Sequence, residues 1–174
     1  MTLNNASART FAILGTAIFF ALAPGTVVVL IPWWITHWHA PAHFHGLTLL
    51  RFIGAVIIAS GAAIIVDSFA RFAWQGLGTP APLYPTRHLV VKGFYRFVRN
   101  PMYVSLLLIL IGQALLFADT RLLIYALGAW LASHLFVLFY EEPRLRRSFP
   151  EDYARFATHV PRWIPRLSPW RTDE

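Results

Sequence analysis

"PMYVSLLLILIGQALLFADTRLLIYALGAWLASHLFVLFY", residues 101–140, decides the fold. Two apolar runs, 102–117 and 122–140, are separated only by residues 118–121. Each run approaches the roughly 20 helical residues that cross a bilayer. A connection this short forces consecutive helices to lie antiparallel. The stretch therefore predicts a transmembrane helical hairpin whose two open ends lie at the same face of the membrane.

Two further apolar runs, 10–31 and 46–66, precede this hairpin. The whole chain is 57% hydrophobic and 13% charged, which is too apolar for a soluble domain of 174 residues. Pro24 and Gly25 interrupt the first run, and proline removes a helical hydrogen bond, so we expect a kink or a break that would give a fifth span. We predict an all-α, polytopic transmembrane bundle of four main spans, forming one domain over residues 1–174.

The basic residues are distributed unequally about the predicted spans. Most of the 15 Lys and Arg residues lie before the first span, between the second and third, or after the fourth, and only Arg51 and Arg121 lie on the other side. Because basic loops stay in the cytoplasm, both termini are predicted there. The basic residues flank apolar runs, which favours contact with lipid headgroups over nucleic acid.

The long connection before the third span ends in "RHLVVKGFYRFVRNPMY", residues 87–103. Asn100 is suited to cap the helix, and Pro101 fits its first turn. Free amides at a helix N-terminus, with Arg96 and Arg99 nearby, form a site for a carboxylate or phosphate. A capped helix with basic membrane anchors accounts for the same residues.

An acidic pair, Glu141 and Glu142, ends the fourth predicted span. At a helix C-terminus each carboxylate opposes the macrodipole, at a cost of a few tenths to about 1 kcal/mol, and requires a cation. Nearby arginines or a ligand ammonium group would supply one. The hairpin brings this pair to the start of the third span, where Tyr95 and Tyr103 offer aromatic faces to a cation. S-adenosylmethionine suits such a pocket, and so does a zwitterionic phospholipid headgroup.

A set of residues spaced along the second half of the chain resembles the integral-membrane methyltransferase superfamily. This superfamily includes isoprenylcysteine carboxyl methyltransferases and phospholipid N-methyltransferases. The resemblance covers about residues 80–166 and is carried by Leu89, Val90, Gly93, Tyr95, Arg99, Asn100, Pro101, Tyr103, Glu141, Glu142, Leu145, Phe149, Tyr153 and "VPRWIP" at 160–165.

The resemblance implies methyl transfer from S-adenosylmethionine to a lipophilic acceptor in the membrane: an isoprenylcysteine-like carboxylate, a phospholipid amine or another small lipophile. It implies that Glu141 holds the amino group of the cofactor, within a cytoplasmic pocket. The other cofactor-binding residues that it implies are His88, Leu89, Val90, Gly93, Tyr95, Asn100, Pro101, Met102 and Tyr103.

Two positions depart from the eukaryotic carboxyl methyltransferases that the pattern resembles. Asn100 stands where those enzymes carry histidine, as in bacterial relatives, and Val137 stands where they carry an arginine associated with substrate. Both departures disfavour prenylcysteine as the acceptor.

Three residues are candidates to orient or deprotonate the acceptor: Arg99, Glu142 and His134. For His134, inside the fourth span, a hydrogen bond to Gln113 on the third span is the plainer interpretation. Another group of histidines lies beside Trp33, Trp34 and Trp38, which favours an interfacial aromatic belt over a metal site. These are His37, His39, His43 and His45.

Two other functions suit parts of this sequence. The basic face would also suit a non-enzymatic lipid-binding scaffold, and the hairpin would suit a membrane reductase that binds a nicotinamide cofactor. Beyond the last span, residues 151–159 predict a short amphipathic helix in the headgroup region.

Overall fold

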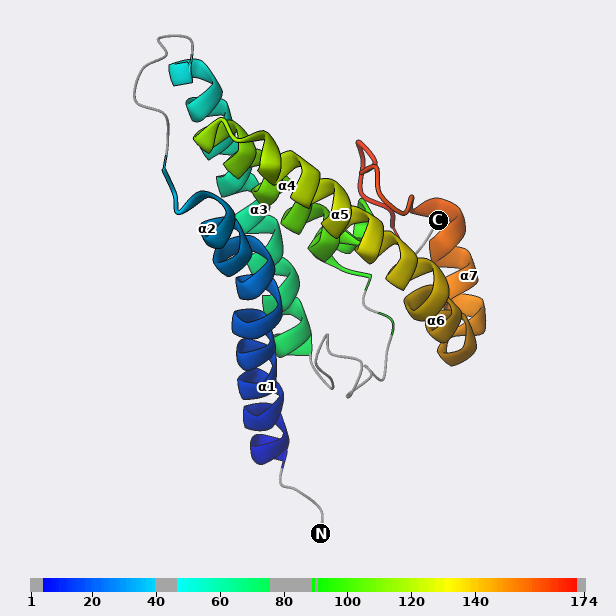
Figure 1. Cartoon of the computed structure of the whole chain (residues 1–174). Helices are drawn as coiled ribbons and strands as arrows, with labels where there is room; N and C mark the ends of the chain where they lie inside the picture. Colours follow the sequence, from blue (N-terminus) through cyan, green and yellow to red (C-terminus); the bar gives the residue numbers. More distant parts are fainter. Residues whose placement is uncertain (1–4, 40–46, 76–88, 90, 172–174) are drawn as a thin grey trace.

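The structure, a computed structural model, describes residues 5–39, 47–75, 89 and 91–171, and the regular elements among them are all helical (Figure 1). Three helical stretches are long and apolar enough to cross a membrane, namely Ala17–Thr36, Thr48–Arg71 and Thr120–Ser148, and a shorter apolar helix spans Pro101–Phe117. In chain order the elements are α1 (Asn5–Gly25), η1 (Thr26–Leu30), α2 (Ile31–Thr36), α3 (Leu47–Gln75), η2 (Gly93–Arg96), α4 (Pro101–Phe117), α5 (Thr120–Phe136), η3 (Val137–Glu141), α6 (Glu142–Ser148) and α7 (Pro150–His159).

The predicted hairpin is formed by α4 and α5. Ala118 ends α4 in the left-handed conformation, with φ of 50°. Asp119 caps α5, because its carboxylate accepts a hydrogen bond of 2.9 Å from the backbone N–H of Arg121. The turn therefore combines an αL C-cap with an acidic N-cap, which reverses the chain in very few residues.

Helices α3 and α4 approach each other closely at two glycines. A Cβ atom on Gly54 would lie 2.6 Å from the carbonyl oxygen of Gly112, and one on Gly112 would lie 2.7 Å from the carbonyl oxygen of Gly54. Side chains at either position would collide with backbone, so only glycine permits this packing. Close approach through small residues is the usual way that helices associate within a membrane.

The first span continues through Pro24, so of the two predicted alternatives, a kink or a break, the break does not occur. Directly after Pro24 and Gly25, the helix widens into the π-helical segment η1. The N–H of Ile31 bonds back to the carbonyl of Thr26, which leaves the carbonyl of Val27 without that donor. The π-helical turn thus continues the helix rather than ending it.

Side chains from the hairpin satisfy the carbonyl groups freed in η1. The hydroxyl of Tyr125 donates to the carbonyl of Val27 over 3.0 Å. The amide of Gln113 donates to the carbonyl of Val28 over 2.6 Å, because Pro32, one turn later, has no N–H to offer. These bonds fix η1 against α4 and α5, as backbone in lipid requires.

The fourth span also continues past its predicted end. α5 passes through the π-helical segment η3 into α6, which ends at Ser148. Glu141 and Glu142 therefore lie within a continuous helix rather than at its C-terminus, so the expected penalty from the macrodipole was wrong. The predicted helix at 151–159 is present as α7.

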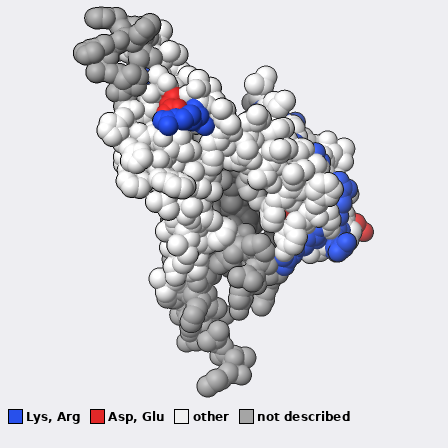
Figure 2. All heavy atoms as spheres, in the orientation of Figure 1, with Lys and Arg blue, Asp and Glu red and all other residues white. Residues whose placement is uncertain are grey.

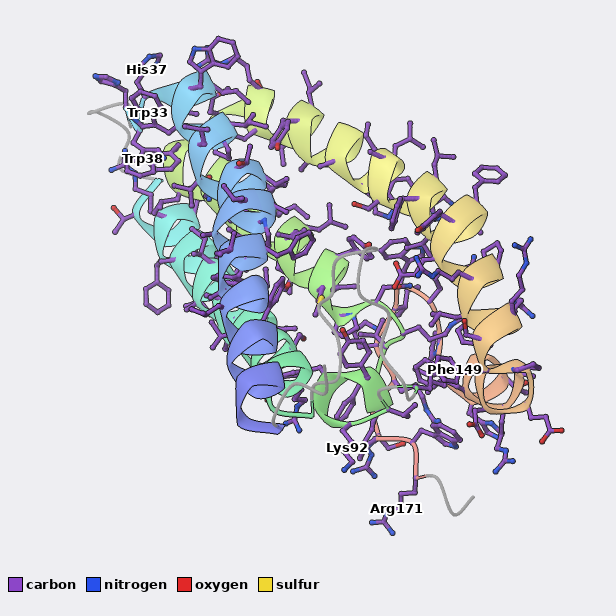
Figure 3. The ribbon with its side chains drawn as sticks, turned by 90° about the horizontal axis from the view of Figure 1, so that it is seen from below. Trp33, His37, Trp38, Lys92, Phe149 and Arg171 are labelled. Carbon is purple, nitrogen blue, oxygen red and sulfur yellow. The ribbon has the colours of Figure 1, made fainter. Side chains whose placement is uncertain are left out.

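The two ends of the bundle differ in composition. Trp33, His37 and Trp38 lie together at one end, and Lys92 and Arg171 lie at the opposite end (Figure 3). On the face drawn in Figure 2, lysine and arginine gather over α6 and α7, and most of the remaining surface is uncharged. His43 and His45 lie outside the described residues. The end with α6 and α7 is called the arginine-rich end below.

Candidate functional site

The candidate site lies where the start of α4 meets η3 and α6. The hydroxyl of Tyr103, in the first turn of α4, donates a hydrogen bond of 3.1 Å to Oε2 of Glu141. The hairpin places these two side chains together because α4 begins and α5 passes into η3 at the same end of the molecule (Figure 1).

The adjacent carboxylates have different surroundings. Glu142 is 6% exposed, and its carboxylate lies 2.6 Å from Nε of Arg162, 3.2 Å from Nη1 of Arg99 and 4.0 Å from Nη2 of Arg146. No arginine or lysine among the described residues forms an ion pair with Glu141. One carboxylate is thus compensated by the protein, and the other lacks a cationic partner within the described part of the chain.

Arg99 links the loop before α4 to this carboxylate pair. Besides Glu142, its Nη1 lies 3.3 Å from the hydroxyl of Tyr153 on α7. Its Nε is buried and donates to no acceptor among the described residues. Arg99 and Glu141 thus line one cavity, the first paired with Glu142 and the second without a cationic partner among the described residues.

The cavity has a volume of about 680 Å³ and joins a polar end to an apolar arm. This volume lies within the usual range for small-molecule sites. Residues at the polar end are Tyr95, Arg99, Asn100, Tyr103, Glu141 and Glu142. The apolar arm continues between η1, α4 and α5, and its lining includes Phe19, Val27, Leu106, Leu110, Gly128 and Ala132. In Figure 2 the visible face is hollowed between these helices.

Tyr95 and Asn100 come from the loop that precedes α4. Burial raises the pKa of the Tyr95 hydroxyl well above its ordinary value, and the charge of Glu141 adds to this effect, so the hydroxyl stays protonated. The Asn100 side chain does not cap α4, contrary to prediction. Its amide instead donates to the carbonyl of Arg162 over 3.1 Å.

The remaining predicted site residues fall in three groups. Leu89 and Met102 line the cavity, whereas His88 and Val90 lie outside the described residues. Pro101 is buried at the start of α4 without lining the cavity. Gly93, with φ of 58°, also lies outside the lining and turns the chain against the Arg71 side chain, which is paired with Asp67.

His134 does not line the cavity. Its Nδ1 accepts a hydrogen bond of 3.0 Å from Nε1 of Trp163, and the expected bond to Gln113 is not formed. The Trp163 ring lies 6.4 Å from that of Tyr103 and 5.7 Å from that of His134. His134 therefore faces the far side of Trp163, away from the acidic pair.

The segment after α7 supplies contacts that the sequence did not predict. Arg162 pairs with Glu142, and Trp163 packs between Tyr103 and His134. The segment has neither helical nor strand periodicity, and only the motif "VPRWIP" marks it.

The model of the phospholipid methyltransferase family matches residues 49–152, well over half of the chain. The chain belongs to the phospholipid methyltransferase family. It is therefore an integral-membrane enzyme that uses S-adenosylmethionine as its methyl donor, which excludes the scaffold and reductase alternatives. The match extends from α3 into α7 and so includes the start of α4, Glu141 and Glu142. No curated protein and no solved structure matches the chain.

Proposed function

We propose that this methyltransferase acts on the headgroup amine of a membrane phospholipid, with both termini in the cytoplasm. The observation that carries the proposal is the continuity of the cavity, whose polar end opens into an arm lined by apolar side chains. A soluble, charged cofactor and a lipid acceptor require these two environments side by side. The description of the family supplies the acceptor class.

S-adenosylmethionine supplies an electrophilic methyl group on a sulfonium, with an ammonium and a carboxylate at its other end. Glu141 is assigned to the ammonium, because it is the cavity carboxylate that no described arginine compensates. Arg99, which lines the cavity near Glu141, is assigned to the carboxylate. Tyr95 and Tyr103 line the same cavity and are assigned to the sulfonium, because aromatic rings attract cations.

Glu142, Asn100 and His134 are positioning residues in this account. Glu142 holds Arg99 against the cavity, and Asn100 holds the carbonyl of Arg162. His134 holds Trp163 near the ring of Tyr103. Their shared effect is to fix the wall at the polar end, since methyl transfer depends chiefly on alignment and exclusion of water.

The apolar arm is assigned to an acyl chain. On α5 its wall includes the small residues Gly128, Ala129 and Ala132, and on the opposite side it includes Phe19 and Val27. A lipid whose acyl chain lies in this arm would have its headgroup near Glu141 and Tyr103. The amine nitrogen of the headgroup would then meet the methyl group of S-adenosylmethionine at the polar end.

The test is methylation of defined lipids by the purified enzyme. Vesicles containing phosphatidylethanolamine, phosphatidylserine or no aminophospholipid are incubated with methyl-tritiated S-adenosylmethionine, and a prenylated cysteine is offered in parallel. We expect base-stable label on the nitrogen of an aminophospholipid. Base-labile label on the prenylcysteine carboxylate, with none on lipid amines, would show that the proposed acceptor is wrong. The assignment of the protein as a methyltransferase would not change.

A further inference from the structure

The segment from Val160 to Trp170 forms a loop that is fastened at both ends. At its start, the carbonyl of Pro161 accepts a hydrogen bond of 2.9 Å from the N–H of Arg99. At its end, Trp170 is buried, its N–H donates to the carbonyl of Arg96 over 2.9 Å, and its carbonyl accepts from Nε of Arg96 over 2.6 Å. We call this segment the C-terminal strap. It lies beyond the residues matched by the family model.

The strap extends along α5, away from the arginine-rich end. Figure 1 shows it rising beside α5 after α7. Trp163 contacts His134 and Trp130, with ring centroids 5.7 and 6.4 Å apart. His134 precedes Glu141 by two helical turns, so Trp163 lies up to about 10 Å from Glu141 along the helix axis. Measured from Glu141, that distance is about a third of a hydrocarbon core about 30 Å thick.

The tip of the strap carries two large apolar side chains that are highly exposed. Ile164 is 78% exposed and Leu167 is 105% exposed. Figure 2 shows uncharged atoms at the projecting end of this loop. Leu131 and Leu135, next to His134 on the surface of α5, are exposed apolar residues of a membrane-spanning helix. The tip therefore continues a lipid-facing surface.

Irregular backbone at membrane depth must have its polar groups satisfied or removed. Pro161, Pro165 and Pro169 remove amide donors at every fourth position of the strap. The N–H of Arg166 donates to the carbonyl of Phe97, and its guanidinium donates to the carbonyl of His159. The Arg162 side chain is turned back onto Glu142. The strap thus presents apolar side chains outward while its charges bond inward.

We propose that the C-terminal strap inserts Ile164 and Leu167 into the acyl region of the bilayer, beside α5. Insertion presses Trp163 against Tyr103 and holds Arg162 on Glu142, so the membrane itself completes one wall of the polar end. The partner of this surface is lipid rather than a second copy of the chain, because the tip is continuous with the apolar face of a span.

Depth-dependent quenching tests this placement. The chain contains no cysteine, so Ile164→Cys and Leu167→Cys each introduce a unique thiol for an environment-sensitive nitrobenzoxadiazole label. Glu151→Cys, at an exposed position of α7, is the control. Each labelled protein is reconstituted into vesicles of phospholipids brominated on the acyl chains, and each is also titrated with aqueous iodide.

We expect labels at 164 and 167 to be quenched by the bromolipids and to be several-fold less sensitive to iodide than the label at 151. If all three labels respond alike to iodide, the strap lies in water and the proposal is wrong. Labels at 164 and 167 shielded from iodide but unaffected by bromolipids would also overturn it, since a second protein copy would then cover the tip. Neither readout requires enzymatic activity or bound cofactor, so a failure here leaves the assigned acceptor untouched.

Discussion

The hydroxyl of Tyr103 bonds to the carboxylate of Glu141 over 3.1 Å, although the two residues are 38 positions apart in the sequence. Glu142, the next residue, faces three arginines instead. The neighbouring carboxylates therefore differ in their partners, a tyrosine hydroxyl for Glu141 and arginines for Glu142. The following predictions test this division and the packing that supports it.

Removing the charge of Glu142 is expected to destabilise the protein. Glu142→Gln leaves Arg99 and Arg162 without their buried counter-ion, and breaking a buried ion pair in this way costs on the order of 3 kcal/mol. Glu151→Gln, on the exposed face of α7, is the control and should change stability by less than about 0.5 kcal/mol. Thermal unfolding in detergent measures both, and equal unfolding temperatures for the two variants would contradict the assignment.

Alanine at two glycines should shift stability in opposite directions. Gly112→Ala places a methyl group against the backbone of α3, and overpacking of this kind costs about 1–3 kcal/mol. At Gly128 a Cβ meets nothing within 4 Å, so Gly128→Ala should gain up to about 1 kcal/mol from helix propensity. An unfolding temperature for Gly112→Ala that stays the same or rises would show that α3 and α4 are not packed as described.

A larger side chain at Gly128 should reduce the use of long-chain acceptors. Gly128→Leu fills the apolar arm and leaves the polar end unchanged, so methylation of long-chain lipid should fall while S-adenosylmethionine affinity remains. Leu127→Phe adds bulk at the neighbouring position, where the side chain is 64% exposed, and should behave like wild type. Equal rates on short-chain and long-chain lipids in the Gly128 variant would show that the arm does not bind the acyl chain.

Tyr95 should make the protein less stable at alkaline pH. Its pKa is raised in the folded state, so the unfolded chain releases the proton first, and stability falls as the pH rises above the ordinary value of about 10. Tyr95→Phe removes this contribution. The difference in unfolding temperature should move in favour of the variant between about pH 9 and pH 11, and a difference independent of pH would contradict the burial of this hydroxyl.

The central hairpin could be predicted from the sequence because length, hydropathy and the short connection act locally. The meeting of Tyr103 with Glu141 followed from that topology alone. The course of the first and fourth spans could not be predicted from the sequence, because proline predicts a disturbed helix without specifying a π-helical segment. η1 is retained because Gln113 and Tyr125, far along the chain, satisfy its free carbonyl groups.

The partners of the acidic pair were also only partly predictable. Arginines near Glu142 were expected, but Arg162 comes from an irregular segment with no periodicity to place it. The partner of His134 was missed for the same reason, since Trp163 belongs to the C-terminal strap. Contacts made by proline-rich segments depend on tertiary structure that no local pattern encodes.

Calorimetric titration of the detergent-solubilised protein with S-adenosylmethionine tests the central claim most directly. Glu141→Gln should weaken binding by about 10-fold or more, because a hydrogen bond to a charged group contributes about 1.5–3 kcal/mol. Glu151→Gln, which makes the same change at an exposed position of α7, should bind as wild type. A folded Glu141→Gln variant with wild-type affinity would contradict the account.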